Sequence, residues 1–349
     1  MARPARMTDV AKTAGVSTMT VSRVLNANPN VKDETRERVF AAIKRLRYHR
    51  NELARSLRDK RTRQIGILVP NLFDPFFANC AHAVGVVAKQ HNYSVNIAIS
   101  NEDPDDEFEE ANRMLHRKVE GVVVIPATPV RGSSQLLLPE FSNLPIVTLD
   151  RPVEGSHYDS VVVQNWSGGQ MGTRHLIALG HKRIAFIGLV GNLYTMRMRQ
   201  QGYREAMTSA RLKPDMQTVT DAPETSVSML RKLMAAKRPP TALFCANNLT
   251  TRHVLHAMQT LMMHPPESIA LVGFDDFETA DLLRPGITVV RKPVESLGRI
   301  AAEALFARLG EGKHGPPKHI ILPVELVVRG SCGARLPQLR HLPKPVSSS

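Results

Sequence analysis

Polar side chains gather on one face of a short segment near the N-terminus, residues 17–26. Helical spacing places Val21, Val24 and Leu25 on the apolar side of this segment. The residues of the opposite side are Thr18, Met19, Ser22 and Arg23. An arginine fork suits paired hydrogen bonds to guanine, and a methionine can contact a thymine methyl. The face is therefore chemically suited to contact with the edges of DNA bases.

A second short helix is expected just before this segment, over residues 8–14. Thr8 or Asp9 can cap its N-terminus, and Gly15 ends it before a tight turn. Two short helices joined by such a turn form a helix-turn-helix, whose second helix can lie in a DNA major groove. The spacing alone also fits a purely structural helix pair. A third helix within residues 33–48 is indicated by the apolar stripe Val39, Ala42, Ile43 and Leu46.

Positive charge is concentrated in the same N-terminal region. The chain of 349 residues has a formal net charge of +14. Residues 1–61 contain fifteen Lys or Arg and six Asp or Glu, a net +9, and the other 288 residues carry +5. A positive field confined to one small domain favours a polyanionic partner, here double-stranded DNA. A basic tail that only aids solubility is the alternative, but the helical pattern of the region argues against it.

Short β-branched runs alternate with helical stretches after residue 63. Such near-continuous apolar strands are typical of parallel sheets covered by helices on both faces. The span is too long for one sheet, so we expect an α/β region of two similar lobes. The predicted strands are 65–69, 95–99, 122–125, 146–149, 161–163, 184–187, 241–244 and 269–272.

Polar and charged residues follow these strands, and ligands of parallel sheets bind beyond the carboxyl ends of the strands. The segments are 71–77, 126–128, 150–151, 191–199, 246–248 and 274–276. None of them offers a paired nucleophile and base. This favours binding over catalysis, and we expect that the protein is not an enzyme.

Cysteine usage and hydropathy favour a cytoplasmic protein. The three cysteines are widely spaced and odd in number, which fits a reducing compartment. The N-terminus lacks the apolar core of a signal peptide, and no apolar run approaches the ~20 residues of a membrane span, so we expect no membrane association. No group of His, Cys or acidic residues has metal-ligand spacing, so we expect neither a metal site nor a cofactor.

The sequence resembles the lactose/galactose-repressor (LacI/GalR) family of bacterial transcription regulators, and the resemblance extends to residue 330. Its N-terminal motifs are Asp9-Val10-Ala11, Ala14-Gly15-Val16-Ser17, residues 20–26, Thr35-Arg36, Tyr48, Asn51 and Ala54-Arg55-Ser56-Leu57. The later motifs are residues 74–77, Gly121-Val122, Leu149-Asp150-Arg151, residues 179–185, Arg199 with Gly202-Tyr203, Ala246-Asn247-Asn248 and residues 272–276. One departure is Lys32, where the family usually has a small capping residue. We expect Asp33 to take that role.

The resemblance implies an all-α helix-turn-helix headpiece followed by a two-lobed α/β effector domain with parallel sheets, similar to type I periplasmic binding proteins. The expected headpiece covers residues 1–50, the hinge helix or linker 51–62, the effector-binding and dimerisation domain 63–330, and a Pro- and Ser-rich disordered tail 331–349. The first lobe would take about 63–162 and 293–321, and the second about 163–290 and 322–330. Crossovers would lie near 163–166, 291–293 and 322–324. The tail lacks leucine heptads, so we expect a homodimer.

The resemblance also implies DNA contacts. Thr18, Met19 and Arg23 would meet base edges, while hydroxyls and backbone amides would hold phosphates. Local capping is an equal alternative for Thr20 and Ser22. The hinge would become helical on DNA and wedge Leu57 into the minor groove, unless Leu57 is a surface residue of a loose linker. The predicted DNA-binding residues are Thr8, Ser17, Thr18, Met19, Thr20, Ser22, Arg23, Asn26, Asn51, Ala54, Arg55 and Leu57.

Arg199 and Asp275 match the family positions that grip hydroxyl or acidic groups of the effector, the small molecule to which these regulators respond. Phe77 and Trp166 could stack on an apolar ligand face or serve as core or rim packing. Departures from residues common in the family occur at Gln164, Asn248 and Lys292, and they bear on the ligand rather than on the fold. The predicted effector-binding residues are Phe76, Phe77, Asp150, Trp166, Arg197, Arg199, Asn247 and Asp275.

We therefore expect a ligand-responsive, sequence-specific repressor of a carbohydrate-utilisation operon that binds a pseudo-palindromic operator. The expected effector is a sugar or sugar acid, and Arg197 beside Arg199 favours an acidic one. A purine corepressor is an alternative, because one branch of the family binds purines. A non-specific DNA-binding protein without effector is another. An enzyme on the two-lobed fold would need a nucleophile–base or metal constellation, which the sequence does not show.

Overall fold

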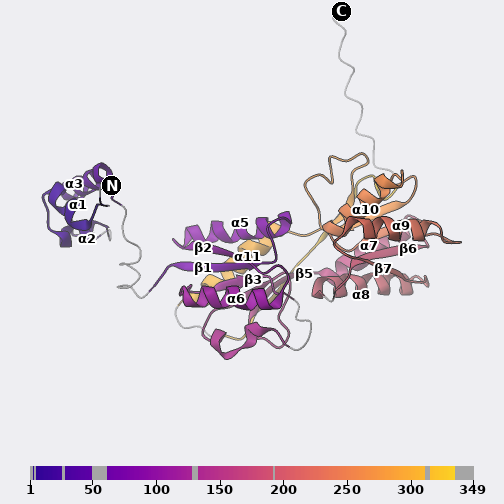
Figure 1. The fold of residues 1–349 in the computed structure, drawn as a ribbon, viewed down its shortest axis with the longest axis horizontal. Coiled ribbons are helices and arrows are strands. Elements are labelled where there is room, and N and C mark those ends of the chain that lie inside the picture. The colour runs from indigo at the N-terminus through magenta and orange to yellow at the C-terminus, as the bar shows by residue number, and fades with distance from the viewer. Residues whose placement is uncertain are drawn as a thin grey trace, which may run out of the picture. The chain divides into compact units, whose positions relative to one another are not determined.

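A computed structural model describes residues 3, 5–25, 28–48, 61–127, 133–191, 193–310 and 315–334. The chain divides into two compact units, Met1–Thr62 and Arg63–Ser349 (Figure 1). Several predicted features lie outside the described residues. They are the DNA contacts Asn26, Asn51, Ala54, Arg55 and Leu57, most of the predicted hinge, and residues 335–349 of the predicted tail. Ser331 and Cys332, which the predicted tail 331–349 included, are instead buried in the second unit.

Three helices make up the described part of the first unit. They are α1 (Met7–Ala14), α2 (Thr18–Leu25) and α3 (Asp33–Leu46). Gly15 ends α1 with a φ of 66°, in the left-handed region that glycine adopts without strain. The helices share one apolar core formed by Val10, Ala11, Ala14, Val21, Val24, Val39 and Ala42. This packing fixes α2 against the other two helices, as expected of a helix-turn-helix.

Two predicted helix caps differ in the structure. Helix α1 begins one residue before Thr8, and the backbone N–H of its N-cap, Arg6, donates to Asp9 Oδ2 at 2.8 Å. The N-cap of α3 is Lys32, whose side chain makes no capping hydrogen bond. The prediction that Asp33 is the cap is therefore wrong. Asp33 is instead the first helical residue, where its carboxylate favours the helix through the macrodipole.

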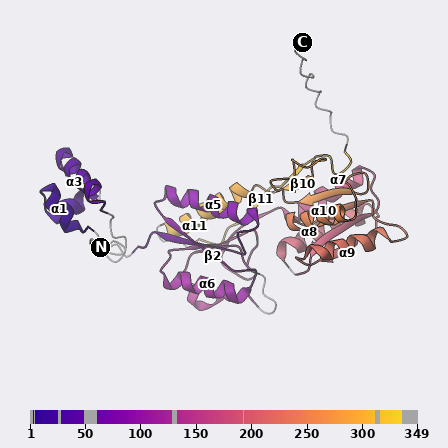
Figure 2. The same cartoon turned by 45° about the horizontal axis from the view of Figure 1, so that its top comes forward.

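The first sheet of the second unit has the order β11-β5-β4-β3-β1-β2, and all of its neighbouring strands are parallel. Its strands are β1 (Gln64–Val69), β2 (Ser94–Ile99), β3 (Val122–Val124), β4 (Ile146–Leu149), β5 (Asp159–Val163) and β11 (His319–Leu322). Helices α5 (Pro75–Gln90) and α11 (Val294–Leu309) cover one face, and α6 (Pro104–His116) covers the other (Figure 2). The short helices η1 (Gln135–Leu137) and η2 (Pro139–Phe141) pack on the α6 side.

The second sheet has the order β12-β10-β9-β8-β6-β7, with only the β10–β12 pair antiparallel among the described strands. Its strands are β6 (Ile184–Leu189), β7 (Asp215–Val219), β8 (Ala242–Cys245), β9 (Ala270–Phe274), β10 (Thr288–Arg291) and β12 (Glu325–Val327). Helices α7 (Asn165–Ala178) and α8 (Tyr194–Ser209) share the core of one face. Helices α9 (Pro223–Met234) and α10 (Asn248–Thr260) share the core of the other.

Two predominantly parallel sheets with helices on both faces confirm the predicted two-lobed α/β fold. We call the part built on the first sheet lobe 1 and the part built on the second sheet lobe 2. The chain passes between them after β5, after β10 and after β11. Two of these crossovers touch, because the N–H of Gln164 donates to the carbonyl of Leu322 at 3.0 Å. The core of α5 and α11 is continuous with that of α7 and α8.

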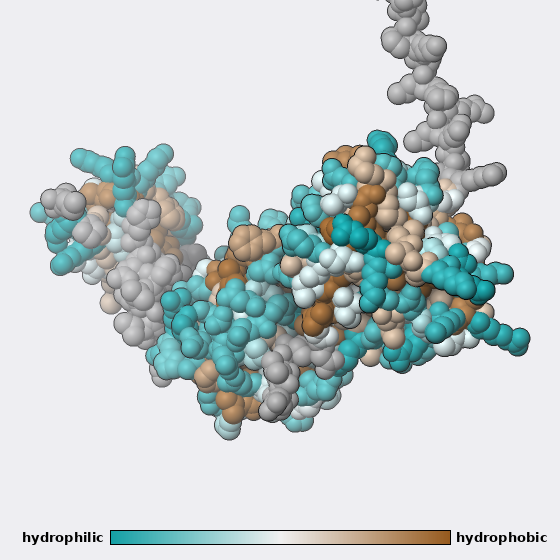
Figure 3. Space-filling model, turned by 45° about the vertical axis from the view of Figure 1, so that its right-hand side comes forward, coloured by the Kyte–Doolittle hydropathy of each residue, from teal (hydrophilic) through white to brown (hydrophobic). Residues whose placement is uncertain are grey.

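On the face drawn in Figure 3, hydrophilic side chains cover most of the second unit and are interrupted by small apolar areas. Among the described residues no helix is both long enough and apolar enough to cross a membrane. The same residues contain no group of three or more His, Cys, Asp or Glu arranged to hold a metal ion.

Candidate functional site

Two aspartates mark the carboxyl ends of corresponding strands in the two lobes. Asp150 follows β4 in lobe 1, and Asp275 follows β9 in lobe 2. Both have left-handed backbone angles, with φ of 65° and 68°, a conformation that aspartate tolerates better than most residues. Each aspartate is more than nine-tenths buried. The two lobes therefore present one buried carboxylate each at the edge where ligands of parallel sheets bind.

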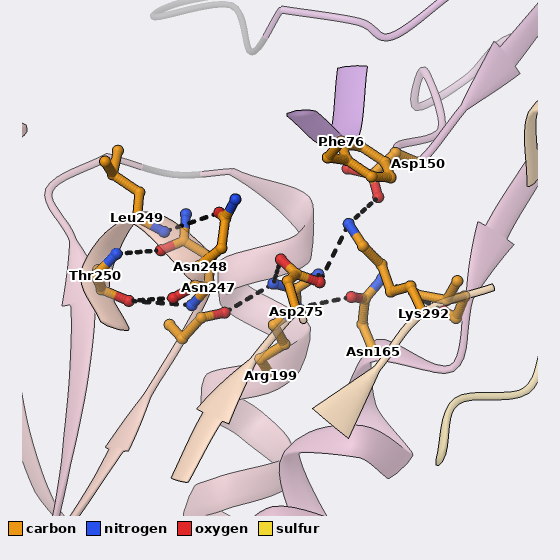
Figure 4. Close-up of polar contacts among 12 residues, drawn as sticks. Phe76, Asp150, Asn165, Arg199, Asn247, Asn248, Leu249, Thr250, Asp275 and Lys292 are labelled. Carbon is orange, nitrogen blue, oxygen red and sulfur yellow. Dashed lines mark hydrogen bonds and ion pairs between the residues drawn. The ribbon is translucent and has the colours of Figure 1, made fainter. Parts of the chain in front are cut away.

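Lys292 joins these two carboxylates (Figure 4). Its Nζ lies 3.2 Å from Asp150 Oδ1 and 3.2 Å from Asp275 Oδ1. The same atom lies 3.4 Å from the ring centroid of Phe76, which stands in the first turn of α5. Only 4% of the lysine side chain is exposed. Lys292 follows β10, so one of the crossovers between the lobes carries the cation.

Arg199 lies behind Asp275 rather than in an open cleft. Its Nη1 donates to Asp275 Oδ2 at 3.0 Å and to the carbonyl of Ala246 at 2.7 Å, and its Nε donates to Asn165 Oδ1 at 2.9 Å. The guanidinium also stacks on Phe274, 3.7 Å from the ring centroid. Arg199 is 1% exposed. Its observed role is to orient Asp275, and ligand contact by Arg199 stays a prediction.

Close packing of α7 on α8 brings Asn165 to Arg199. A Cβ atom added to Gly169 would lie 2.3 Å from the carbonyl oxygen of Arg199, and one added to Gly202 would lie 2.1 Å from that of Trp166. Both distances are far below van der Waals contact, so only glycine allows the two backbones to approach this closely. The glycines thereby set the position of the arginine that holds Asp275.

Charges around Asp150 keep its carboxyl group ionised. Burial acts to raise the pKa of Asp150, but Lys292, Arg151 and Arg199 act against it, and the net pKa lies below the usual value. Arg151 is itself held by a forked pair of hydrogen bonds to Glu102, at 2.6 and 2.7 Å. Burial would lower the pKa of Arg151, whereas the hydrogen bonds and charge of Glu102 raise it. The site is therefore a set of compensated charges with few free carboxylate oxygens.

An open pocket of about 320 Å³ adjoins Lys292 and Asp275, which is large enough for a small ligand. It lies between α5 and the segment that follows β9. Its lining includes Phe76, Asn79, Asn248, Asp275, Asp276, Arg291, Lys292 and Arg329. Asp276 is held by Arg329 through hydrogen bonds of 3.0 and 2.8 Å. The pocket thus combines two aromatic rings, Phe76 and Phe277, with groups that can donate or accept hydrogen bonds.

The other predicted effector residues take different positions. Phe77 is 7% exposed and belongs to the apolar core. Asn247 caps α10, because its side-chain oxygen accepts a hydrogen bond from the N–H of Thr250 at 2.9 Å. Arg197 forms an ion pair of 2.9 Å with Glu154 of lobe 1. Trp166 is 39% exposed in the first turn of α7. Their contacts with a ligand stay predictions.

Three residues of this site were not among those predicted to bind the effector. Asn248 lies in the predicted post-strand segment 246–248 and Lys292 in the predicted crossover 291–293, and both depart from the family pattern. Asn165 lies in the predicted crossover 163–166. Asn248 Nδ2 donates to Asp74 Oδ1 across the lobes at 3.0 Å. The signal that could have identified Asn165 and Lys292 is their place directly beyond the ends of β5 and β10.

In the first unit, α2 exposes the predicted base-contacting residues. Thr18 and Arg23 are exposed, and Met19 is 65% exposed, although a buried position would suit its apolar side chain. Ser17 Oγ accepts the N–H of Thr20 at 3.1 Å, and the two hydroxyl oxygens are 2.9 Å apart. Local capping therefore accounts for the Ser17–Thr20 pair, and contact of these hydroxyls with phosphates stays a prediction. Thr8 is exposed and Ser22 is half-buried.

Comparison with protein families assigns both units. Residues 6–51 match the family described as bacterial regulatory proteins, lacI family, and residues 173–332 match the periplasmic binding protein-like domain. The HTH-type transcriptional repressor PurR of Mannheimia succiniciproducens is 31% identical over 330 residues, which cover 94% of this chain and 98% of the relative. The repressor of the same name from Pasteurella multocida is 32% identical over 335 residues, which cover 95% and 100%.

Solved structures agree with this assignment. The lac repressor dimer bound to operator and the anti-inducer ONPF has a TM-score of 0.84 and 25% identity, with 95% of this chain and 100% of that chain covered. The complex of the transcriptional regulator CelR with cellobiose has a TM-score of 0.67 and 29% identity, with 94% and 99% covered. With its helix-turn-helix unit and its two-lobed binding unit, the chain belongs to the lacI family of bacterial regulatory proteins, which are ligand-responsive DNA-binding repressors.

Proposed function

We propose that the protein is a cytoplasmic homodimer that binds a pseudo-palindromic operator through α2 and binds a small effector between its two lobes. The observation that carries the effector site is the ionic chain Asp150–Lys292–Asp275–Arg199, which runs from lobe 1 into lobe 2. A ligand that alters this chain changes contacts between the lobes. A dimer supplies two copies of α2, and its two-fold symmetry predicts half-sites about one helical turn apart.

A carbohydrate, and in particular a sugar acid, is the first candidate for the effector. The pocket supports a carbohydrate because it is lined by carboxylates that can accept hydroxyl donors, namely Asp275, Asp276, Glu278 and Asp281. Its three cations, Arg291, Lys292 and Arg329, are the groups that would hold the acidic group of a sugar acid. The solved relative CelR in complex with cellobiose adds support from the same fold. The regulated genes would then serve the use of that carbohydrate.

A purine is the second candidate. The PurR repressors at 31–32% identity favour it, since one branch of the family responds to purines. Phe76 offers an aromatic surface beside the pocket for a planar base. A purine acting as corepressor would promote operator binding, whereas an inducer would release it.

The effector must bind one arrangement of the lobes more tightly than the other if it is to alter DNA binding. The coupling is reciprocal, so operator DNA must change the affinity for effector by the same factor. The direction of the response follows from which arrangement of the lobes binds the operator.

The test is thermal unfolding of the full chain with a panel of sugars, sugar acids, sugar phosphates and purines. A ligand at 100 times its Kd stabilises the native state by about 2.7 kcal/mol, which moves the melting curve clearly. We expect one class to stabilise the wild type and Glu303→Gln, a variant of an exposed carboxylate on α11, but not Asp275→Asn. Absence of any stabilising ligand, together with equal affinity for operator and random DNA, would favour a DNA-binding protein without effector.

A further inference from the structure

The ligand cleft already contains a cationic group of the protein itself. We propose that Lys292 is a built-in ligand, whose ammonium group holds the two lobes together when no effector is bound. This inference rests on the proposed function in one respect, namely that the cleft between the lobes is the effector site. The further point is that an effector that binds Asp275 must displace the ammonium group of Lys292.

The surroundings of the ammonium group are those of a bound primary amine. An ammonium group has three N–H donors. One of them donates to Asp150 Oδ1 of lobe 1 at 3.2 Å. Asp275 Oδ1 of lobe 2 forms an ion pair with the same nitrogen at 3.2 Å, and the ring centroid of Phe76 lies 3.4 Å away. Paired carboxylates with an aromatic face form the combination that binds a cation strongly once water is excluded. The ammonium group of Lys292 therefore has the contacts that a separately bound primary amine would have at this place.

Charge balance explains why the cation is needed. Asp150 and Asp275 are 4% and 8% exposed, and a buried carboxylate without a partner is costly. Arg199 pairs with Asp275 at 3.0 Å, while Arg151 Nε lies 3.9 Å from Asp150 Oδ2. Lys292 is the cation that contacts both aspartates. Its removal leaves Asp150 with only the 3.9 Å contact of Arg151, whereas Asp275 keeps its pair with Arg199.

Among the described residues, two further polar side-chain contacts cross between the lobes, and both differ from the contact of Lys292. Asn248 reaches Asp74 by a hydrogen bond between an amide and a carboxylate. The ion pair of Arg197 with Glu154 is exposed to solvent, with 36% and 82% of the side chains accessible, so salt screens it. The contact of Lys292 with Asp150 is a buried ion pair across the lobes. We therefore assign to it the main role in closing the cleft without ligand.

The contact between Lys292 and Asp275 also means that an effector competes with the lysine for the carboxylate of Asp275. An effector that takes the Oδ1 atom of Asp275 must break the contact with Lys292, and its apparent affinity falls accordingly. A variant without the lysine side chain gains an empty site with two carboxylates. The atoms removed from Lys292 in a change to alanine correspond to propylammonium.

The test is chemical rescue of Lys292→Ala by propylammonium at neutral pH. We expect the variant to have a lower Tm than the wild type and a broader distribution of sizes in small-angle X-ray scattering, because the lobes separate. Propylammonium should recover most of the loss in Tm in a saturable manner and restore the compact scattering profile. The wild type and Lys89→Ala, which removes an exposed lysine on α5, should not respond. Neither should Lys292→Ala respond to 1-propanol, which lacks the charge.

Lys292→Met provides a second variant in case the alanine variant does not fold. Methionine reaches as far as the ε carbon of lysine but lacks the charged nitrogen, so we expect open lobes and no response to propylammonium. Wild-type compactness and Tm in Lys292→Met would overturn the proposal, as would failure of propylammonium to stabilise a folded Lys292→Ala. The rescue experiment and the effector panel test different proposals. If a stabilising effector is found but propylammonium does not rescue Lys292→Ala, only the proposal for Lys292 fails. If propylammonium rescues the variant but no effector is found, only the assignment of the effector site fails.

Discussion

Asp150 and Asp275 are structural equivalents in the two lobes. Each is the first residue beyond a parallel strand, and each donates its N–H to the neighbouring strand at 2.8 Å, Asp150 to Val161 and Asp275 to Val290. The likeness of the lobes thus places like charges opposite each other in the cleft. Lys292 compensates this repulsion because it sits on the crossover between them.

Asn248→Asp should weaken closure of the lobes. The new carboxylate would stand where Asn248 Nδ2 now lies 3.0 Å from Asp74, so two like charges would repel. We expect a loss of about 0.5–3 kcal/mol in unfolding free energy, the usual range for coupled neighbours. Asp74→Asn in the same chain should restore much of it, because asparagine can still cap α5 and donate to the new carboxylate. Additive losses in the double variant would contradict the contact.

Gly169→Ala should destabilise lobe 2. The added methyl group would lie 2.3 Å from the carbonyl oxygen of Arg199 and would force α7 and α8 apart. Overpacking of this kind costs about 1–3 kcal/mol, measured here by denaturant unfolding. The matched control is Gly85→Ala on α5, where a Cβ meets nothing within 4 Å. Alanine there should stabilise by about 0.4–1 kcal/mol, and equal losses in both variants would argue against the close approach.

Glu107 should make stability depend on pH. Burial raises its pKa from 4.5 to about 7, although its carboxylate accepts the N–H of Ala127 at 2.6 Å. The folded state holds the proton more tightly than the unfolded state does, so this contribution is fully present below about pH 4.5 and is lost as pH rises to about 7. The total is on the order of 3 kcal/mol.

The variant Glu107→Gln isolates that contribution. It should flatten the dependence of unfolding free energy on pH between about 4.5 and 7, measured by denaturant titration at each pH. Near pH 8 it should be more stable than the wild type, because no buried carboxylate must ionise. An unchanged slope would show that other groups dominate this range.

Arg23→Ala should lower operator affinity by about 1–3 kcal/mol and relax preference at one base pair, because Arg23 is exposed on α2 and suited to guanine. The control is Arg38→Ala, which removes the same charge from an exposed site on α3. It should weaken operator and random duplexes by the same factor. Binding titrations on both duplexes decide the outcome, and equal weakening by Arg23→Ala would exclude base readout by this residue.

The two-lobed fold could be predicted from sequence because its central strands are continuous apolar runs. The edge strand β7, by contrast, was not predicted, since Asp215, Gln217 and Thr218 interrupt its apolar pattern. Strand β12 is short and antiparallel, and it depends on pairing with β10. The edge strand β2 was predicted, whereas the largely buried strand β10 was not. Local pattern therefore identifies many strands of both sheets but does not separate their centres from their edges.

Only those site residues that directly follow a predicted strand could be located from the sequence. Asp150 and Asp275 follow strongly apolar strands, so their location could be inferred. The contact of Lys292 with Asp150 joins residues 142 positions apart in sequence and depends on how the lobes meet. The choice between Phe76 and Phe77 depends on the rotation of α5, which turns Phe77 into the core and leaves Phe76 beside Lys292. No local pattern specifies either relation.

Lys292 belongs both to the cleft and to a crossover between the lobes. A substitution at this position that changes which molecule fits will therefore also change the resting equilibrium between open and closed forms. Selectivity and basal repression cannot be adjusted independently there. In the course of evolution, a new effector preference acquired through residue 292 would demand a compensating change elsewhere, either at the other contacts between the lobes or in the strength of the operator.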